Sequence, residues 1–147
     1  MQDNYFAGVG AVVFKGSDVL LVRHTYGAAA GKLLNPGGYV KYGELPADAA
    51  KREVFEETGV AVNPVGVIAV RCSGTEWYIC FAAEYISGEP HSDGAENSEA
   101  VWLDRAEALS RADVTDSAKR LIRLAAGTVP LTPEIDGKNR VWYAVSG

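Results

Sequence analysis

Three glutamates, Glu53, Glu56 and Glu57, lie close together in a segment of helical character. At roughly 100° per residue, all three fall on one side of a helix. Like charges at this spacing repel each other by about 0.2–0.5 kcal/mol per pair unless cations lie between them. Hard cations such as magnesium take oxygen ligands and complete their shell with water and phosphate oxygens. The cluster therefore indicates metal-assisted phosphate chemistry, and the alternative is an acidic helix face that simply contacts solvent.

A glycine-rich segment precedes this helix and should lie next to its carboxylates. Pro36, Gly37 and Gly38 indicate a loop with unusual backbone angles. Glu44, in the same loop, and Arg52, one turn into the helix, can form a bidentate ion pair that pins the loop to the helix. We therefore expect these two residues to have a structural role, and removing either should loosen the site.

The spacing of these residues resembles the Nudix box over 23 residues without a gap. Gly38 is followed by five residues and Glu44, then by seven residues and the segment 52–60, and every fixed position of the motif is matched. The motif joins a loop, a helix and a helix cap in the required order, which makes the match specific. Together with the flanking elements, the resemblance covers about residues 1–126. It implies an α/β fold, a Nudix-type α/β/α sandwich with a mixed β-sheet.

The resemblance also implies a hydrolase that cleaves a diphosphate with the help of Mg²⁺ or Mn²⁺. Glu53, Glu56 and Glu57 are the implied metal ligands and catalytic carboxylates, and the Gly38 carbonyl is a further ligand. The metal would acidify a water molecule, neutralise the diphosphate oxygens and stabilise the leaving phosphate. The alternative is a non-catalytic Nudix domain that senses a nucleotide metabolite, and the intact glutamates count against it.

Several residues outside the box are candidates by their position. The family often supplies one more catalytic glutamate before a late strand, which favours Glu96 over Glu99. Either acid could ligate a metal, accept the proton of the attacking water, or face solvent in a loop. Arg23, at the end of a strand, is placed like arginines that contact substrate phosphate, with a surface ion pair as the alternative. Gly37 belongs to the entry of the site and is assigned to substrate binding.

The box does not fix the group attached to the diphosphate. Trp77, Tyr78 and Phe81 could stack on a base, which favours a nucleoside diphosphate derivative or a nucleoside triphosphate. Alternation along a strand would send only some of them to a pocket, and for Tyr78 packing in the core or the pocket wall is the favoured interpretation. Glu76 stands where ADP-ribose hydrolases carry a proline, which counts against that substrate. Asn35 replaces the apolar residue that is usual in the family, so it marks a distinct substrate group.

The cysteines and histidines carry no assigned chemistry. Cys72 and Cys80 form no CxxC pair and are interpreted as buried thiols. Their spacing gives no support to an isoprenyl diphosphate isomerase, which has a similar fold and needs a catalytic cysteine. His24 and His91 lack the spacing of metal ligands and are assigned to loops.

The predicted elements alternate between strands and helices. Pro46 suits the first turn of a helix and Gly59 the left-handed residue that ends one, so the firmest helix spans 46–58. The other expected elements are strands at 5–14, 18–23, 60–71 (interrupted near Pro64 and Gly66), 75–86 and 100–103, a polar loop at 87–98, and a helix at 115–126. The tail 127–147 contains a strand at 141–145 that would extend the sheet or pair with a second subunit in a homodimer.

Length and composition define the broad class. A chain of 147 residues with 48% hydrophobic residues predicts one domain, 1–147. The net charge of -5 argues against broad nucleic-acid binding, so the expected partner is a small-molecule nucleotide or another diphosphate. No segment approaches the roughly 20 apolar residues of a membrane span, and the first residues lack a secretory signal, which makes the cytoplasm the default location.

Overall fold

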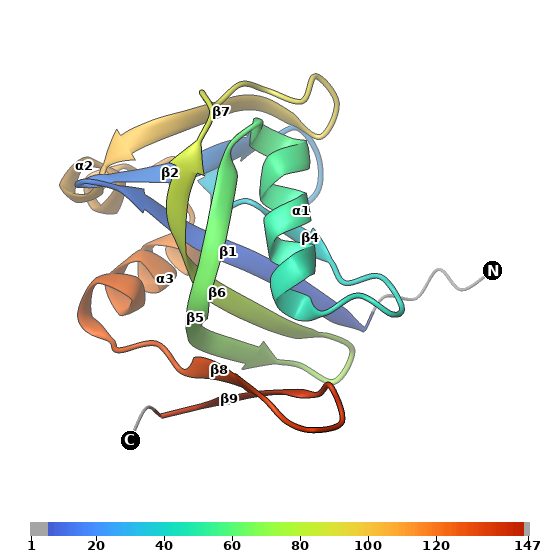
Figure 1. The fold of residues 1–147 in the computed structure, drawn as a ribbon. Coiled ribbons are helices and arrows are strands. Elements are labelled where there is room, and N and C mark those ends of the chain that lie inside the picture. The colour runs from blue at the N-terminus through green and yellow to red at the C-terminus, as the bar shows by residue number, and fades with distance from the viewer. Residues whose placement is uncertain (1–5, 146–147) are drawn as a thin grey trace.

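The computed structural model describes residues 6–145, which form a mixed β-sheet with helices on both faces (Figure 1). The strand order is β3-β2-β1-β6-β5, with β4 added against β1 and β7 against β2. β1 pairs with β6 in parallel and with its other neighbours antiparallel. The elements are β1 (Ala7–Lys15), β2 (Asp18–His24), β3 (Leu33–Leu34), β4 (Gly37–Tyr39), α1 (Pro46–Thr58), β5 (Ala61–Cys72), β6 (Trp77–Ser87), β7 (Asn97–Asp104), α2 (Arg105–Ser110), α3 (Asp116–Gly127), β8 (Thr132–Ile135) and β9 (Val141–Ala144).

The two faces of the sheet carry separate hydrophobic cores because side chains alternate along β1. Val12 packs with Ala118 and Ile122 of α3 on one face. Ala11 packs on the other face with Val54 of α1. Figure 1 shows α1 and α3 on either side of the strands. The predicted α/β/α sandwich with a mixed sheet is therefore confirmed.

Helix α1 has the predicted bounds, 46–58. Pro46 stands in its first turn, and Gly59 adopts the left-handed conformation, φ 78°, while its N–H donates to the Phe55 carbonyl. This φ favours glycine, which explains why the helix ends there. The buried residues Ala49 and Val54 fix the face that packs on the sheet. This orientation turns Glu53 and Glu57 toward β4.

The segment Gly37–Tyr39 was expected to be an irregular loop and is instead strand β4, paired with residues 8–10 of β1. Neither Gly37 nor Gly38 has a positive φ. The prediction of unusual backbone angles is therefore wrong. Glycine is needed there for close approach, because a Cβ on Gly37 would collide with the Val9 carbonyl oxygen and one on Gly38 with the Glu53 carboxylate.

Most other predicted elements are confirmed with small shifts. Strand β5 has register irregularities around Pro64 and Gly66, as expected. Strand β7 begins at Asn97, so the polar loop ends earlier than predicted. Cys80 is buried, but Cys72 is exposed at the end of β5, which corrects its assignment as a buried thiol. The sequence reading missed four short elements, namely β3, β4, α2 and β8.

The tail forms a two-stranded hairpin, β8 and β9, that lies beside the main sheet (Figure 1). It is attached where the backbones of Leu131 and Val67 exchange two hydrogen bonds of 2.8 Å, and where Tyr143 packs edge-on against Phe81. The predicted strand at 141–145 is confirmed as β9. Within residues 6–145, no helix combines the length and apolar character that crossing a membrane requires.

Candidate active site

Two carboxylates of α1, those of Glu53 and Glu57, face strand β4. The Gly37 N–H donates to Oε1 of Glu57 at 2.7 Å, and the Tyr39 N–H donates to Oε2 of Glu53 at 3.3 Å. Glu57 is only 5% exposed. The Gly38 backbone lies directly against the Glu53 carboxylate, which leaves no room for a side chain at that position. The helix and the glycine strand therefore form one acidic site.

The environment of Glu57 disfavours a bare negative charge. Burial, and then the charges of Glu53, Glu96 and Asp93, raise the pKa of Glu57 to about 8, although the Gly37 N–H opposes this shift. Burial also raises the pKa of Glu53. Placing carboxylates together out of water is costly unless a cation is present. A donor set made only of oxygens fits Mg²⁺ or Mn²⁺, which use few protein carboxylates and keep several waters.

Glu56 is more exposed than this pair and shares the Nη1 group of Arg52 with Glu53, whose Oε2 lies 3.3 Å from that nitrogen. The Glu56 side chain is 55% exposed and forms an ion pair of 3.1 Å with Arg52. Across residues 6–145, no three His, Cys, Asp or Glu side chains are already grouped as a metal site would require. The structure thus brings two of the three box glutamates together at β4, and the assignment of Glu56 as a metal ligand stays a prediction.

Arg52 and Glu44 form the expected bidentate pair. Nε of Arg52 donates to Glu44 at 2.8 Å and Nη2 donates at 2.9 Å, while Nη2 also reaches the Tyr39 carbonyl at 3.0 Å. The hydrogen bond from Arg52 is the main cause that lowers the pKa of Glu44 to about 2. Both side chains are largely buried. Arg52 thereby ties the loop after β4 to α1.

This pair makes stability depend on pH. Because the pKa of Glu44 falls from 4.5 to about 2 on folding, its contribution is complete above pH 4.5 and disappears as the pH falls through 2. Glu44→Gln should lower the free energy of unfolding by about 1–2 kcal/mol at pH 7, after allowance for solvent screening, and by less at pH 3. Urea denaturation at both pH values measures this difference. Glu84→Gln, at an exposed position on β6, is the control, and an equal loss at pH 7 and pH 3 would contradict the assignment.

Arg23 is held in an ion-pair network instead of facing the acidic site. Its Nε donates to Glu99 at 3.0 Å, its Nη2 to Asp113 at 3.1 Å and its Nη1 to the Gly31 carbonyl at 2.8 Å. Arg23 and Arg111 together hold the pKa of Asp113 well below its usual range, with Arg111 the larger cause. This geometry favours the ion-pair interpretation of Arg23, and its contact with substrate phosphate stays an untested prediction.

The two candidate acids near the start of β7 differ in their surroundings, since Glu96 precedes the strand and Glu99 lies within it. Glu99 is engaged by Arg23, whereas Glu96 is exposed and contributes to the raised pKa of Glu57. Asn97, which the sequence reading missed, is 2% exposed and donates to the Glu57 backbone carbonyl at 2.9 Å. It anchors the loop to the last turn of α1. Glu96 is therefore the acid without an ion pair to Arg23, and its role as the additional acid stays a prediction.

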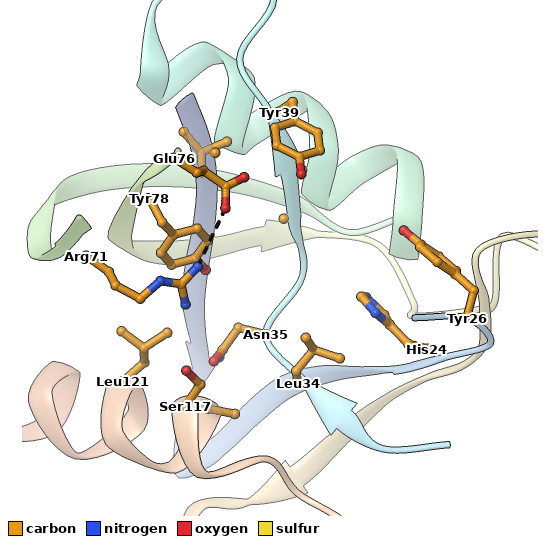
Figure 2. Close-up of a pocket in the computed structure, with 15 residues that line it drawn as sticks. His24, Tyr26, Leu34, Asn35, Tyr39, Arg71, Glu76, Tyr78, Ser117 and Leu121 are labelled. Atoms are coloured by element: carbon orange, nitrogen blue, oxygen red, sulfur yellow. Dashed lines mark ion pairs between the residues drawn. The ribbon is translucent and has the colours of Figure 1, made fainter. Parts of the chain in front are cut away.

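A cavity of about 240 Å³ adjoins the acidic site (Figure 2). Gly37 and Gly38 line it and also contact Glu57 and Glu53, so the cavity and the carboxylates share β4. The Gly37 N–H already donates a hydrogen bond to Glu57, so Gly37 can contact a ligand only through its other atoms. The remaining lining residues are Gly8, Val9, His24, Tyr26, Leu34, Asn35, Tyr39, Arg71, Glu76, Tyr78, Ser117, Ala118 and Leu121.

Of the three aromatic residues proposed to stack on a base, only Tyr78 lines the cavity. Phe81 is fully buried in the core, and Trp77 packs on Phe6 outside the cavity. The stacking role expected of Trp77 and Phe81 is therefore not supported at this cavity, that of Tyr78 stays a prediction, and the expected alternation along the strand is confirmed. Tyr78 occupies the space left by Gly10, where a Cβ would collide with the tyrosine hydroxyl. It forms part of the pocket wall.

Arg71 covers the ring of Tyr78. The guanidinium carbon lies 4.6 Å from the ring centroid, and a guanidinium nitrogen lies 4.0 Å from Glu76 (Figure 2). His24, at the end of β2, also lines the cavity, so its assignment to a loop is wrong, whereas His91 does lie in a loop. Neither Arg71 nor His24 was singled out from the sequence, because only the tertiary fold brings them to β4.

A helix that presents buried carboxylates to a glycine strand, beside a small cavity in a mixed sheet, defines a site suited to phosphate chemistry. The chain belongs to the Nudix family, since the NUDIX domain family matches residues 4–125. A Nudix hydrolase structure from Nitrosomonas europaea is 27% identical, with a TM-score of 0.71 over 86% of this chain and 93% of that chain. A MutT Nudix hydrolase from Burkholderia pseudomallei has a TM-score of 0.68 at 21% identity, over 81% of this chain and 96% of the other.

Curated relatives share the domain within longer proteins. An 8-oxo-dGDP phosphatase from Danio rerio is 30% identical over 66% of this chain and 31% of its own length. An NAD-capped RNA hydrolase from Haemophilus influenzae is 29% identical over 76% of this chain and 44% of its own length. The chain therefore spans less than half of the length of these relatives.

Proposed function

We propose that this chain is a Mg²⁺- or Mn²⁺-dependent hydrolase that cleaves the diphosphate of a nucleoside diphosphate derivative or a nucleoside triphosphate. The observation that carries the proposal is the shared strand β4, which contacts both carboxylates and also lines the cavity. One ligand can therefore place its diphosphate at the glutamates and the attached group in the cavity. The substrates named for the two curated relatives are also nucleotide derivatives.

Glu53 and Glu57 would hold the metal through their carboxylate oxygens, with the Gly38 carbonyl and Glu56 as the further ligands that the box implies. The bound cation supplies charge neutralisation at the diphosphate and lowers the pKa of the attacking water. The chain holds these groups in position through Arg52, which fixes the loop after β4, and through the Gly37 N–H, which orients Glu57. Glu96 is the group proposed to accept the proton of the water.

A substrate panel tests this function. The full chain is incubated with nucleoside triphosphates, sugar nucleotides and dinucleoside polyphosphates, each with Mg²⁺ and with Mn²⁺, and the release of phosphate and diphosphate is measured. We expect turnover of at least one nucleotide that requires the metal and stops with a chelator. Binding of nucleotides without any turnover across the panel would overturn the proposal and support a sensor domain.

A further inference from the structure

Asn35 is a buried amide without a partner. It lies immediately before Pro36 and the glycine strand β4, and it is only 7% exposed. Neither its side-chain oxygen nor its side-chain nitrogen has a hydrogen-bond partner among the residues that the structure describes. Burying an unsatisfied donor and an unsatisfied acceptor destabilises a folded chain, and such groups are rare in native proteins. Stability therefore does not explain why an asparagine stands at this position.

Asn35 lines the same cavity that adjoins the carboxylates. Its two amide atoms are themselves shielded from solvent, so a ligand in the cavity reaches them when the side chain turns toward it. Figure 2 shows Asn35 beside Leu34 and Ser117, facing the space that Arg71 and Tyr78 also border. Much of the surrounding wall is apolar, since Val9, Leu34, Ala118 and Leu121 contribute to it. A pocket with apolar walls and a few polar groups that converge on it is typical of sites that orient a small ligand.

We propose that Asn35 is a specificity-determining residue that hydrogen-bonds the edge of the substrate's nucleobase, an inference that rests on the proposed function. The asparagine amide presents an acceptor beside a donor. It therefore matches a base edge that presents a donor beside an acceptor, as the amino group and N7 of adenine do. An edge with two acceptors, such as O6 and N7 of guanine, cannot satisfy both atoms. A base bound in this way would satisfy the two groups that the free protein leaves unpaired.

Two neighbouring features fit a planar ligand. Arg71 lies over Tyr78, and its side chain is 60% exposed, so it can offer a guanidinium plane on which a base can stack. Gly37 and Gly38 line the cavity and also contact Glu57 and Glu53, so a ligand whose base lies at Asn35 can have its diphosphate close to these carboxylates. The cavity of about 240 Å³ suits a base better than a complete nucleotide.

The first test compares Asn35→Leu, which keeps the approximate shape and removes both polar groups, with the wild-type chain. The substrates are the four common nucleoside triphosphates, purine riboside triphosphate, which lacks a base donor, and tripolyphosphate, which lacks a base. The kcat/KM of the variant should fall roughly 5- to 150-fold for the preferred nucleotide. For purine riboside triphosphate and for tripolyphosphate, its kcat/KM should stay within about twofold of the wild-type value. Asn63→Leu, at an exposed position on β5, is the matched control.

The second readout separates a structural role from recognition. Because the leucine removes unsatisfied groups, metal-free Asn35→Leu should melt at the temperature of the wild-type chain or above it. A lower melting temperature together with equal losses for all substrates would show a structural role and overturn the inference. Unchanged kcat/KM for every nucleotide would also overturn it, while metal-dependent turnover would leave the proposed function intact.

A third measurement covers the case in which no substrate is turned over. Adenosine, guanosine, cytidine and uridine are titrated separately into ¹⁵N-labelled protein, and the Asn35 side-chain amide resonances are followed. Shifts that saturate in the wild-type chain, with binding lost in Asn35→Leu, would support the inference although hydrolysis had failed. Absence of both turnover and nucleoside binding would overturn the two proposals together.

Discussion

Glu57→Gln should reduce metal-dependent turnover by at least roughly 100-fold while the fold remains intact, because it removes a charged group from the proposed metal site. The glutamine oxygen can still accept the hydrogen bond from the Gly37 N–H. Without metal, the variant should melt at the temperature of the wild-type chain or above it, since glutamine removes the cost of burying a carboxyl group whose pKa is raised to about 8. Steady-state kinetics on the substrate found by the panel and thermal melting measure the two effects.

Metal binding gives this prediction a second observable. Mg²⁺ should raise the melting temperature of the wild-type chain, because a ligand that binds only the folded state stabilises it, and should have little effect on Glu57→Gln. Glu134→Gln, which makes the same change at an exposed position on β8, is the control and should behave like the wild-type chain. Turnover at the wild-type rate in Glu57→Gln would contradict the assignment of Glu57 to the cation site.

The two glycines of β4 should respond differently to the same substitution. Gly37→Ala places a Cβ against the Val9 carbonyl oxygen and 2.8 Å from the Gly10 Cα, both of which are backbone atoms that cannot move alone. We expect it to destabilise the fold by about 1–3 kcal/mol. Gly38→Ala instead meets the end of the Glu53 side chain, which can rotate away. Gly38→Ala should destabilise the fold less than Gly37→Ala, and it should lower kcat by displacing the carboxylate of Glu53, a proposed metal ligand.

Urea denaturation and steady-state kinetics on both variants separate these effects. Gly74→Ala is a suitable control, since no atom lies within 4 Å of the added Cβ and the glycine has no positive φ. If Gly38→Ala were as unstable as Gly37→Ala yet fully active, the close approach of β4 to Glu53 would have no functional role.

Local signals explain which parts of the fold could be predicted. The bounds of α1 follow from Pro46 and Gly59, which act within one turn of the helix ends. Strand β4 could not be predicted from local signals, because its structure depends on pairing with β1, about thirty residues away in the sequence. Helix α2 is short, and its cap at Asp104, which accepts hydrogen bonds from the Ala106 and Glu107 N–H groups, was the signal that could have located it.

The site could be predicted as a set of residue types but not as an arrangement. A helical wheel places all three glutamates of the box on one side, yet Glu57 is buried and Glu56 is exposed, because the packing of Val54 on the sheet sets the rotation of α1. The Glu44–Arg52 pair was predictable since both partners belong to the motif. The roles of Asn35 and Asn97 depend on residues brought together only by the sheet.

The parallel pairing of β1 with β6 also affects how the protein folds. It joins residues 7–14 to residues 77–84, with the whole acidic helix between them in the chain. Closing so long a loop is entropically slow, and sheets built from distant segments fold more slowly than those built from hairpins. Because Gly8 and Tyr78 are register partners in this pair, the cavity wall can form only once the loop has closed. Ligand-binding competence should therefore appear late in refolding, together with the central strands rather than with the early formation of α1.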